Sequence, residues 1–215
     1  PNSENIEVST LSSSINNDKA ALAFSSLNLK QDLLKNLSSL SYQEMTPIQA
    51  MSLPEMLVGK DVIAQGKTGS GKTAAFGLAL LEKLKVKRFR IQSMVLCPTR
   101  ELADQVAKEI RKLARAIHNI KVLTLCGGTP FGPQIGSLEH GAHIIVGTPG
   151  RIEEHVIKGT LKLDDLNLLI LDEADRMLEM GFEAALDNII ERTPVDRQTL
   201  LFSATFPKQI QAISV

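Results

Sequence analysis

A loop that binds phosphate groups is predicted by eight consecutive residues, Gly66-Lys67-Thr68-Gly69-Ser70-Gly71-Lys72-Thr73. Its glycines free the backbone to turn successive N–H groups toward an anion, and a helix starting at the loop would add the positive end of its dipole. Lys72 would place its charge on the β- and γ-phosphates of a nucleotide, and the Thr73 hydroxyl would bind Mg²⁺. A glycine-rich turn before an ordinary helix is the alternative, and the pattern disfavours it because three residue types are fixed in the right context.

A second group of candidate residues is acidic, Asp172-Glu173-Ala174-Asp175, and it follows the apolar run 168–171. In a chain with a phosphate loop, an acidic pair at the end of a hydrophobic strand is the pattern that holds Mg²⁺ and polarises water. Asp172 would contact the metal shell, and Glu173 would orient and deprotonate the attacking water. The alternative, a solvated strand end, does not account for the phosphate loop in the same chain.

The elements that position these residues follow from the alternation of short apolar runs with helical segments. Such alternation predicts an α/β fold, a mostly parallel sheet with helices on its faces. The predicted strands are 61–65, 94–97, 122–126, 143–146, 168–171 and 199–202. The predicted helices are 27–40, one starting near Thr46-Pro47, 74–84, 100–117, 132–139, 151–158 and 182–191.

Ligands of open α/β sheets bind beyond the carboxyl ends of the strands, so the residues just after each apolar run are further candidates. Small and hydroxyl-bearing residues there, with an arginine as donor, suit the close approach of a sugar-phosphate backbone. Any one of these segments alone would be read as a capped turn, and their shared edge favours a site. They are Pro98-Thr99-Arg100-Glu101-Leu102-Ala103, Gly127-Gly128 and Thr148-Pro149-Gly150-Arg151. A further segment at the same edge, Ser203-Ala204-Thr205, follows the last predicted strand.

Composition predicts one globular domain, residues 23–215, after a disordered tail, residues 1–22, that is rich in serine and asparagine. The 215 residues contain 24 Lys+Arg and 24 Asp+Glu, so net charge neither supports nor excludes RNA as a partner. No apolar run approaches the length of a membrane span, and the start lacks a signal-peptide core, so we expect a soluble cytoplasmic protein. Cys97 and Cys126 lie in apolar runs, which favours buried thiols.

Three patterns favour structural over functional interpretations. The basic runs 83–90 and 108–115 could face RNA, but their setting is more typical of solvated surface. His140 and His143 are three residues apart without companion ligands, so a metal site there is disfavoured.

Taken together, the ordered motifs resemble the N-terminal RecA-like domain of the DEAD-box RNA helicases, a P-loop NTPase fold. The resemblance runs from Phe24 to Thr205 and includes Phe24, Thr46-Pro47-Ile48-Gln49, the phosphate loop, the acidic tetrad and the four edge segments. The runs 123–132 and 197–202 are similar to the bacterial branch of the family called DbpA, which acts on large-subunit ribosomal RNA.

The resemblance implies roles that periodicity does not reveal. Thr46 and Gln49 would bind the nucleotide, with Gln49 on the adenine edge and Phe24 stacked on the base, so that ATP with Mg²⁺ is selected. The segments 98–100, 127–128 and 148–151 would bind the RNA backbone. Ser203 and Thr205 would couple hydrolysis to strand separation through the acidic motif. Ser41 stands where the family usually has glycine, and Gly66 where it usually has alanine.

The family's second RecA-like domain, with its arginine fingers, is absent from these 215 residues. The resemblance therefore implies the ATP-binding half of a monomeric RNA helicase, nearly inactive by itself, that acts on RNA, with ribosomal RNA as a candidate target. A DNA-directed P-loop translocase and an ATP-gated RNA clamp are the alternatives.

Overall fold

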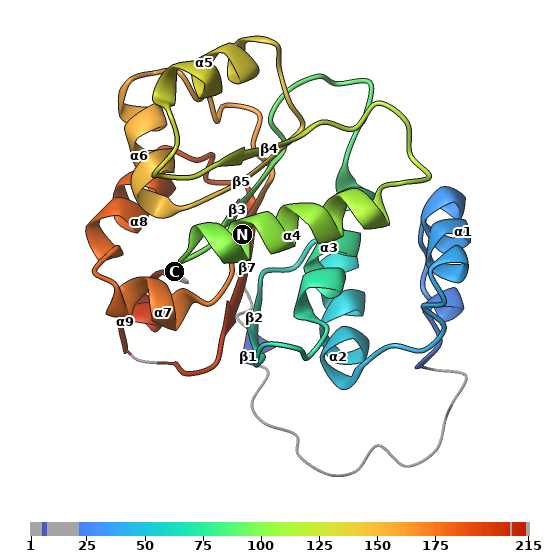
Figure 1. Ribbon diagram of the computed structural model, residues 1–215. Helices are drawn as coiled ribbons and strands as arrows, with labels where there is room; N and C mark the ends of the chain where they lie inside the picture. The colour runs from blue at the N-terminus through green and yellow to red at the C-terminus, as the bar shows by residue number, and fades with distance from the viewer. Residues whose placement is uncertain (1–5, 8–21, 207, 214–215) are drawn as a thin grey trace.

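A parallel sheet with helices on both faces organises the computed structural model, which describes residues 6–7, 22–206 and 208–213 (Figure 1). Within these residues the strand order is β1-β2-β7-β6-β3-β5-β4, and every pairing is parallel. The strands are β1 (Ile6–Glu7), β2 (Val62–Gln65), β3 (Ser93–Leu96), β4 (Val122–Leu125), β5 (Ile144–Gly147), β6 (Leu168–Leu171) and β7 (Gln198–Ser203). The predicted α/β fold is confirmed.

The central strands read as apolar runs because helices cover both of their faces. β3, β5 and β6 are buried along their whole length. Their side chains alternate between two cores: Val95 packs with the helices of one face, while Met94 and Leu96 pack with those of the other.

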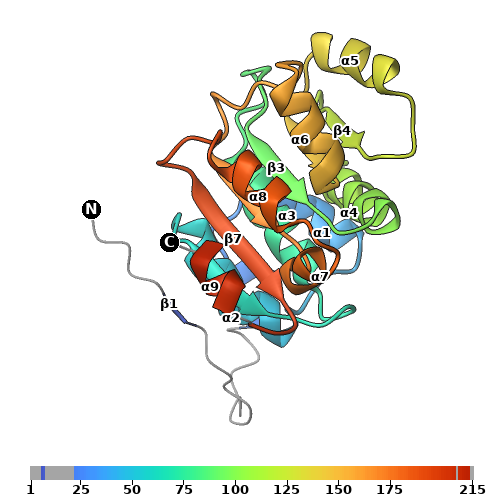
Figure 2. The same ribbon diagram turned by 90° about the vertical axis from the view of Figure 1, so that its left-hand side faces the viewer.

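The helices divide between the two faces of the sheet. The first core includes side chains of α1 to α4, and the second includes those of α6 to α9 (Figure 2). The helices are α1 (Gln31–Ser39), α2 (Pro47–Leu57), α3 (Lys72–Lys83), α4 (Arg100–Leu113), α5 (Phe131–Glu139), α6 (Pro149–Ile157), α7 (Ala174–Glu179), α8 (Glu183–Ile190) and α9 (Lys208–Ile213), with a 3-10 turn, Phe24–Ser26.

The structure moves some predicted boundaries. The helix predicted over 100–117 ends at Leu113, where Asn36 Nδ2 donates to the carbonyl oxygens of Lys112 and Leu113. That contact comes from α1, far away in the sequence, so local periodicity carries no sign of it. The helices α7 and α9 have only six residues each, too few for a helical repeat to show.

Three further expectations concern the chain as a whole. The tail predicted over 1–22 lies outside the described residues apart from Ile6–Glu7 and Leu22, and Ile6–Glu7 pairs with β2. Among the described residues no helix is both long and apolar enough to cross a membrane. Cys97 and Cys126 are buried free thiols, as predicted.

Candidate nucleotide and RNA site

The phosphate loop joins the carboxyl end of β2 to α3 and depends on glycine at two positions. Gly69 and Gly71 have φ angles of 83° and 89°, in the left-handed region that favours glycine. A Cβ at Gly71 would lie 2.6 Å from Gln49 Nε2 and 2.8 Å from Thr46 Oγ1. The loop is therefore packed directly against the start of α2.

Lys72, the first residue of α3, forms an ion pair with the acidic motif. Its Nζ lies 2.7 Å from Asp172 Oδ1 and 3.6 Å from Glu173 Oε1. The Lys72 and Asp172 side chains are only 5% and 0% exposed. Burial raises the pKa of Asp172, and the Lys72 charge opposes that rise. The structure thus brings the predicted phosphate-binding cation and the predicted metal-binding carboxylate together.

Glu173 turns the chain sharply after β6 and directs its carboxylate at the phosphate loop. Its φ of 51° and ψ of 53° are left-handed, which is uncommon for a residue with a Cβ. Glu173 Oε1 accepts from Thr68 Oγ1 at 3.3 Å, and Oε2 lies 3.5 Å from Arg176 Nη1. The side chain keeps 16% exposure, so water can reach it.

The donor set fits a magnesium ion held mainly by its water shell and by a nucleotide. Asp172 Oδ2 is buried without a hydrogen-bond partner in the described part of the chain, and Thr73 lines the adjoining cavity. No cluster of three or more His, Cys, Asp or Glu side chains able to hold a metal occurs among the described residues. Mg²⁺ at phosphate sites usually takes one or two protein oxygens and keeps several waters, so this arrangement is sufficient.

A cavity of about 490 Å³ extends from Lys72 and Glu173 to the residues predicted to bind the base. It is lined by Phe24, Tyr42, Thr46 and Gln49. Gln49 Oε1 accepts from Thr46 N at 2.8 Å, and Nε2 donates to Gly71 O at 3.0 Å. The Phe24 side chain is mostly buried, stacked on Tyr42 with ring centroids 6.3 Å apart. One cavity therefore joins the base and phosphate candidates.

A second hollow, of about 540 Å³, shares Lys72 and Glu173 and reaches Asp175 and Ala204. Thr205 donates from N and Oγ1 to Asp175 Oδ2, at 3.1 and 3.0 Å. Ser203 Oγ accepts from Asp175 N at 3.2 Å and donates to Thr205 O at 2.6 Å. Burial would raise the pKa of Asp175, but these hydrogen bonds and one from the Arg176 amide lower it. The predicted contact between segment 203–205 and the acidic motif is present.

Three predicted RNA-binding segments meet where β3, β5 and β4, which are neighbours in the sheet, end. Thr99 caps α4, with Oγ1 accepting from Leu102 N at 3.3 Å. Gly127 N donates to Thr148 Oγ1 at 3.4 Å, which ties the Gly127-Gly128 turn to the start of α6. Gly128 has a φ of 77°. Arg100 begins α4, Pro149, Gly150 and Arg151 form the first turn of α6, and Pro98 lies in the bend that precedes Thr99.

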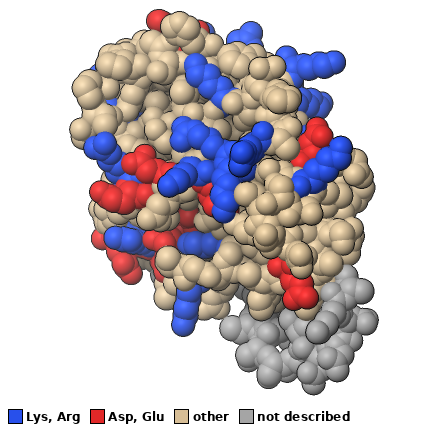
Figure 3. All heavy atoms as spheres, turned by 45° about the vertical axis from the view of Figure 1, so that its right-hand side comes forward, with Lys and Arg blue, Asp and Glu red and all other residues tan. Residues whose placement is uncertain are grey.

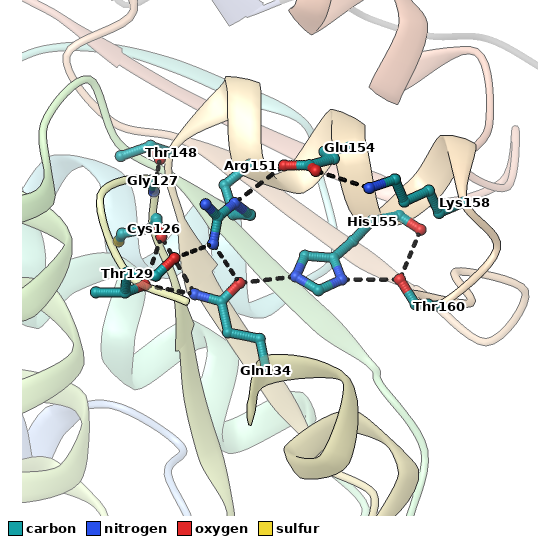
Figure 4. Close-up of polar contacts among 10 residues, drawn as sticks. All are labelled: Cys126, Gly127, Thr129, Gln134, Thr148, Arg151, Glu154, His155, Lys158 and Thr160. Atoms are coloured by element: carbon teal, nitrogen blue, oxygen red, sulfur yellow. Dashed lines mark hydrogen bonds and ion pairs between the residues drawn. The ribbon is translucent and has the colours of Figure 1, made fainter. Parts of the chain in front are cut away.

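Arg151 has partners within the protein that the sequence did not predict. Its Nη1 donates to Thr129 O at 2.9 Å and to Gln134 Oε1 at 3.0 Å (Figure 4). Its Nε lies 3.2 Å from Glu154 Oε2, and the side chain is 13% exposed. By contrast, the Arg100 side chain is 53% exposed.

The comparisons with known proteins agree with this geometry. A family model described as DEAD/DEAH box helicase matches residues 46–213. The chain belongs to the DEAD-box helicase family.

Similar proteins place it at the N-terminal RecA-like domain of DEAD-box helicases. The ATP-dependent RNA helicase DbpA of Escherichia coli K12 is 61% identical over 193 residues, 89% of this chain and 42% of that protein. The DEAD-box ATP-dependent RNA helicase CshA of Geobacillus kaustophilus is 47% identical over 191 residues, 89% of this chain and 41% of that protein. The chain thus spans about two fifths of these relatives.

A solved structure shows the same DEAD-box fold. The crystal structure of a DEAD box protein from the hyperthermophile Methanococcus jannaschii superposes with a TM-score of 0.85 at 41% sequence identity. The match covers 89% of this chain and 52% of that one.

Sequence reasoning missed several residues at the DEAD-box nucleotide cavity. Tyr42 and the α4 side chains Gln105, Val106 and Glu109 line it. Tyr42 Oη donates to Glu109 Oε1 at 2.9 Å. The α4 residues share a helical face whose spacing indicates only packing, so no signal within α4 distinguishes them.

The basic run 83–90 and the histidine pair lie apart from the DEAD-box motifs, whereas Lys112 of the run 108–115 donates to Tyr42 Oη at 3.3 Å beside the nucleotide cavity. The residues Lys83, Lys85, Lys87, Arg88 and Arg90 are exposed and precede β3, at the opposite edge of the sheet from the phosphate loop. Basic side chains also gather on the face that includes α4, with acidic ones among them (Figure 3). His143 is buried, with Nδ1 accepting from Lys121 N at 3.0 Å and Nε2 2.9 Å from Val86 O.

Proposed function

We propose that this chain is the ATP-binding half of an RNA-dependent ATPase that opens short RNA duplexes by holding and bending one strand. The observation that supports this most is that Lys72 and Glu173 line both the nucleotide cavity and the second hollow, which reaches segment 203–205. Hydrolysis chemistry and the link to RNA would thus share the same two side chains. Residues 23–215 would form this domain.

The nucleotide would be bound along the cavity, with Gln49 and Phe24 toward adenine and residues 66–73 around the phosphates. Lys72 would exchange its partner Asp172 for phosphate oxygens. Asp172 and Thr73 would hold Mg²⁺, partly through water, and the ion would neutralise phosphate charge. Glu173 would accept the proton of the water that attacks the γ-phosphorus, releasing ADP and phosphate.

RNA would bind across the ends of β3, β5 and β4 through phosphate contacts. Backbone N–H groups and helix N-termini at 98–100, 127–128 and 148–151 suit phosphates and carry no base information. The similarity to proteins named RNA helicases favours RNA over DNA. The DbpA similarity further suggests ribosomal RNA, a role in ribosome assembly, a cytoplasmic location and a monomer as working hypotheses.

One comparison separates the candidate functions. In a protein carrying this domain and a second RecA-like domain, ATPase stimulation by RNA but not by DNA is expected. Stimulation by DNA would indicate a translocase, whereas RNA-stimulated turnover without duplex unwinding would indicate an ATP-gated clamp.

The 215-residue chain alone is expected to bind adenine nucleotide weakly and to lack RNA-stimulated turnover. An arginine supplied from across a cleft is worth about 10³–10⁵ in phosphoryl-transfer rate, and here it would come from the second domain. Robust RNA-dependent ATPase by the 215 residues alone would refute the two-domain mechanism.

A further inference from the structure

A hydrogen-bonded hub centred on Gln134 contacts two of the proposed RNA-binding segments, 127–128 through their flanking residues and 148–151 through Arg151 (Figure 4). The Gln134 Nε2 atom donates to Cys126 O at 3.2 Å and to Thr129 Oγ1 at 2.9 Å. Its Oε1 faces Arg151 Nη1 at 3.0 Å and His155 Nε2 at 2.8 Å. One side chain of α5 therefore connects the end of β4 to two turns of α6.

The chemistry of its partners fixes which way each group of the hub points. Arginine can only donate, so the Gln134 atom facing Arg151 must be the oxygen. That oxygen cannot donate to His155, so His155 Nε2 must carry a proton. Burial lowers the pKa of His155, helped by the Arg151 and Lys158 charges against the opposing effect of Glu154, and this favours the neutral ring. His155 Nδ1 then accepts from Thr160 Oγ1, 2.8 Å away, and this hydroxyl shares its one proton with His155 O, 3.1 Å away.

The hub bounds the Gly127-Gly128 turn on both sides. Gln134 binds the residue just before the glycine pair, Cys126, and the residue just after it, Thr129. Thr129 Oγ1 also donates to Cys126 O at 2.9 Å, which closes the turn on itself. These hydrogen bonds restrain the Gly127-Gly128 backbone.

The hub also sets the direction of the Arg151 guanidinium. Both N–H groups of Nη1 are used, by Thr129 O and Gln134 Oε1, and Nε pairs with Glu154. The Nη2 group remains, and within the described residues it has no protein partner. An RNA phosphate bound at segments 127–128 and 148–151 would accept from Arg151 Nη2.

The helix α5 has few buried contacts. None of its residues is fully buried, and cavities of about 410 and 300 Å³ lie along it. Among the side chains of α5 that pack on α6 is Phe131, whose ring stacks on His155 with centroids 4.1 Å apart. Leu138 adds an apolar contact with the second core, and Lys158 and Arg151 lie over the Phe131 ring, 4.3 and 5.4 Å from its centroid. Gln134 adds the hydrogen bonds that tie α5 to the Gly127-Gly128 turn and to His155 of α6.

We infer that Gln134 and His155 are positioning residues for RNA binding, which orient the Gly127-Gly128 turn and the Arg151 guanidinium toward the phosphate backbone. This inference rests on the proposed RNA-binding function. It assigns no direct RNA contact to either residue.

The test measures binding of a fluorescein-labelled single-stranded RNA to the 215-residue chain at several salt concentrations. Gln134→Met keeps the side-chain length and removes the hydrogen bonds, and we expect about a tenfold loss of affinity. The slope of log affinity against log salt should also fall by about 0.7 for each phosphate that the protein no longer neutralises. Gln134→Glu, which keeps an acceptor for Arg151 and His155, should recover part of both effects.

Ser137→Ala is the matched control, because Ser137 lies one turn along α5 and donates only within that helix, to Pro133 O. It should match the parent. If Gln134→Met lowered stability but kept the parent's affinity and salt slope, the hub would be merely structural. Tighter RNA binding by that variant would mean that the hub restrains Arg151, again contradicting the inference.

A nuclear magnetic resonance measurement tests the same hub without RNA. The ¹⁵N shifts of the His155 ring should show a proton on Nε2 and a bare Nδ1. The opposite tautomer would overturn the assignment. A parent chain that fails to bind RNA would overturn the inference, whereas the proposed function fails only if a two-domain protein lacks RNA-stimulated ATPase.

Discussion

Lys72 Nζ and Asp172 Oδ1 form a buried ion pair, 2.7 Å apart, at the centre of the nucleotide site. Nucleotide binding would have to replace this pair, because the same ammonium is the predicted phosphate ligand. The pair therefore links phosphate affinity to the stability of the domain. Removing Lys72 leaves the buried Asp172 carboxylate without its cation, whereas removing Asp172 leaves Lys72 with Glu173 alone.

Lys72→Met should destabilise the chain by about 3–5 kcal/mol near neutral pH as well as abolish nucleotide binding. The loss should depend on pH, because without Lys72 the already raised pKa of Asp172 rises further. A raised carboxyl pKa favours the folded state below the usual value of 3.8 and loses that contribution as pH rises through the folded-state pKa. The gap in melting temperature between parent and variant should thus widen from pH 4 upward. Lys72→Met with Asp172→Asn is the control, and a double variant no more stable than Lys72→Met would contradict the pairing.

Gly66→Ala should be tolerated only if Ile48 gives way. A Cβ at Gly66 would lie 2.6 Å from Ile48 Cδ1, which is too close. We expect the single change to cost about 0.5–1.5 kcal/mol, because Cδ1 is the flexible end of the Ile48 side chain and can move aside into a less favourable rotamer. Ile48→Val removes that Cδ1 atom, so the double variant should be more stable than the sum of the single effects by about 0.5 kcal/mol or more. Urea unfolding of the four proteins measures the coupling, and strict additivity would show that the two side chains do not meet.

Ser41→Gly should stabilise the chain. Ser41 has a φ of 61°, a left-handed conformation that costs a residue with a Cβ about 1–2 kcal/mol. Glycine removes that strain but gains about 0.4–1 kcal/mol of freedom when unfolded, so the net gain should be about 0.5–1 kcal/mol. Asn119→Gly is the control, because Asn119 has a φ of 65° and asparagine tolerates this region. Equal gains at both sites would mean that Ser41 carries no special strain.

Gln49→Ala should weaken ATP and ADP at least several-fold and leave the already poor binding of GTP or CTP nearly unchanged, because only the adenine edge loses its partner. The structure adds a second cost, since the Thr46 amide loses its acceptor, Gln49 Oε1. A fall in melting temperature alone would reflect that bond. Titration calorimetry with the four nucleotides tests the base role, and unchanged selectivity would refute it.

The sequence predicted the fold and the site motifs because both depend on local patterns. The buried strand Leu168–Leu171 was predicted to the residue, since an apolar run between helical segments is a local signal. The sequence did not predict the residues that hydrogen-bond to the site residues, because those bonds depend on tertiary contacts. Gln134 and His155 lie 17 and 4 residues from Arg151 along the chain, yet both complete its surroundings. Likewise, the bond from Tyr42 to Glu109 exists only because α4 packs beside the base cavity.

Glu173→Gln should separate binding from turnover. Glu173 Oε1 lies 3.6 Å from Lys72 Nζ, so its loss removes a competitor for that ammonium and a negative charge near the phosphates. ATP affinity should be unchanged or higher. The amide cannot take a proton from water, and a general base contributes about 10²–10⁴ to rate, so kcat in a two-domain protein should fall by about 10² or more. Glu191→Gln, the same charge change at an exposed position just after α8, should leave kcat as in the parent. Steady-state ATPase with saturating RNA, beside nucleotide titration, checks both quantities. If Glu173→Gln turned ATP over normally, Glu173 would be only the left-handed residue that starts α7, and the proton acceptor would have to lie elsewhere.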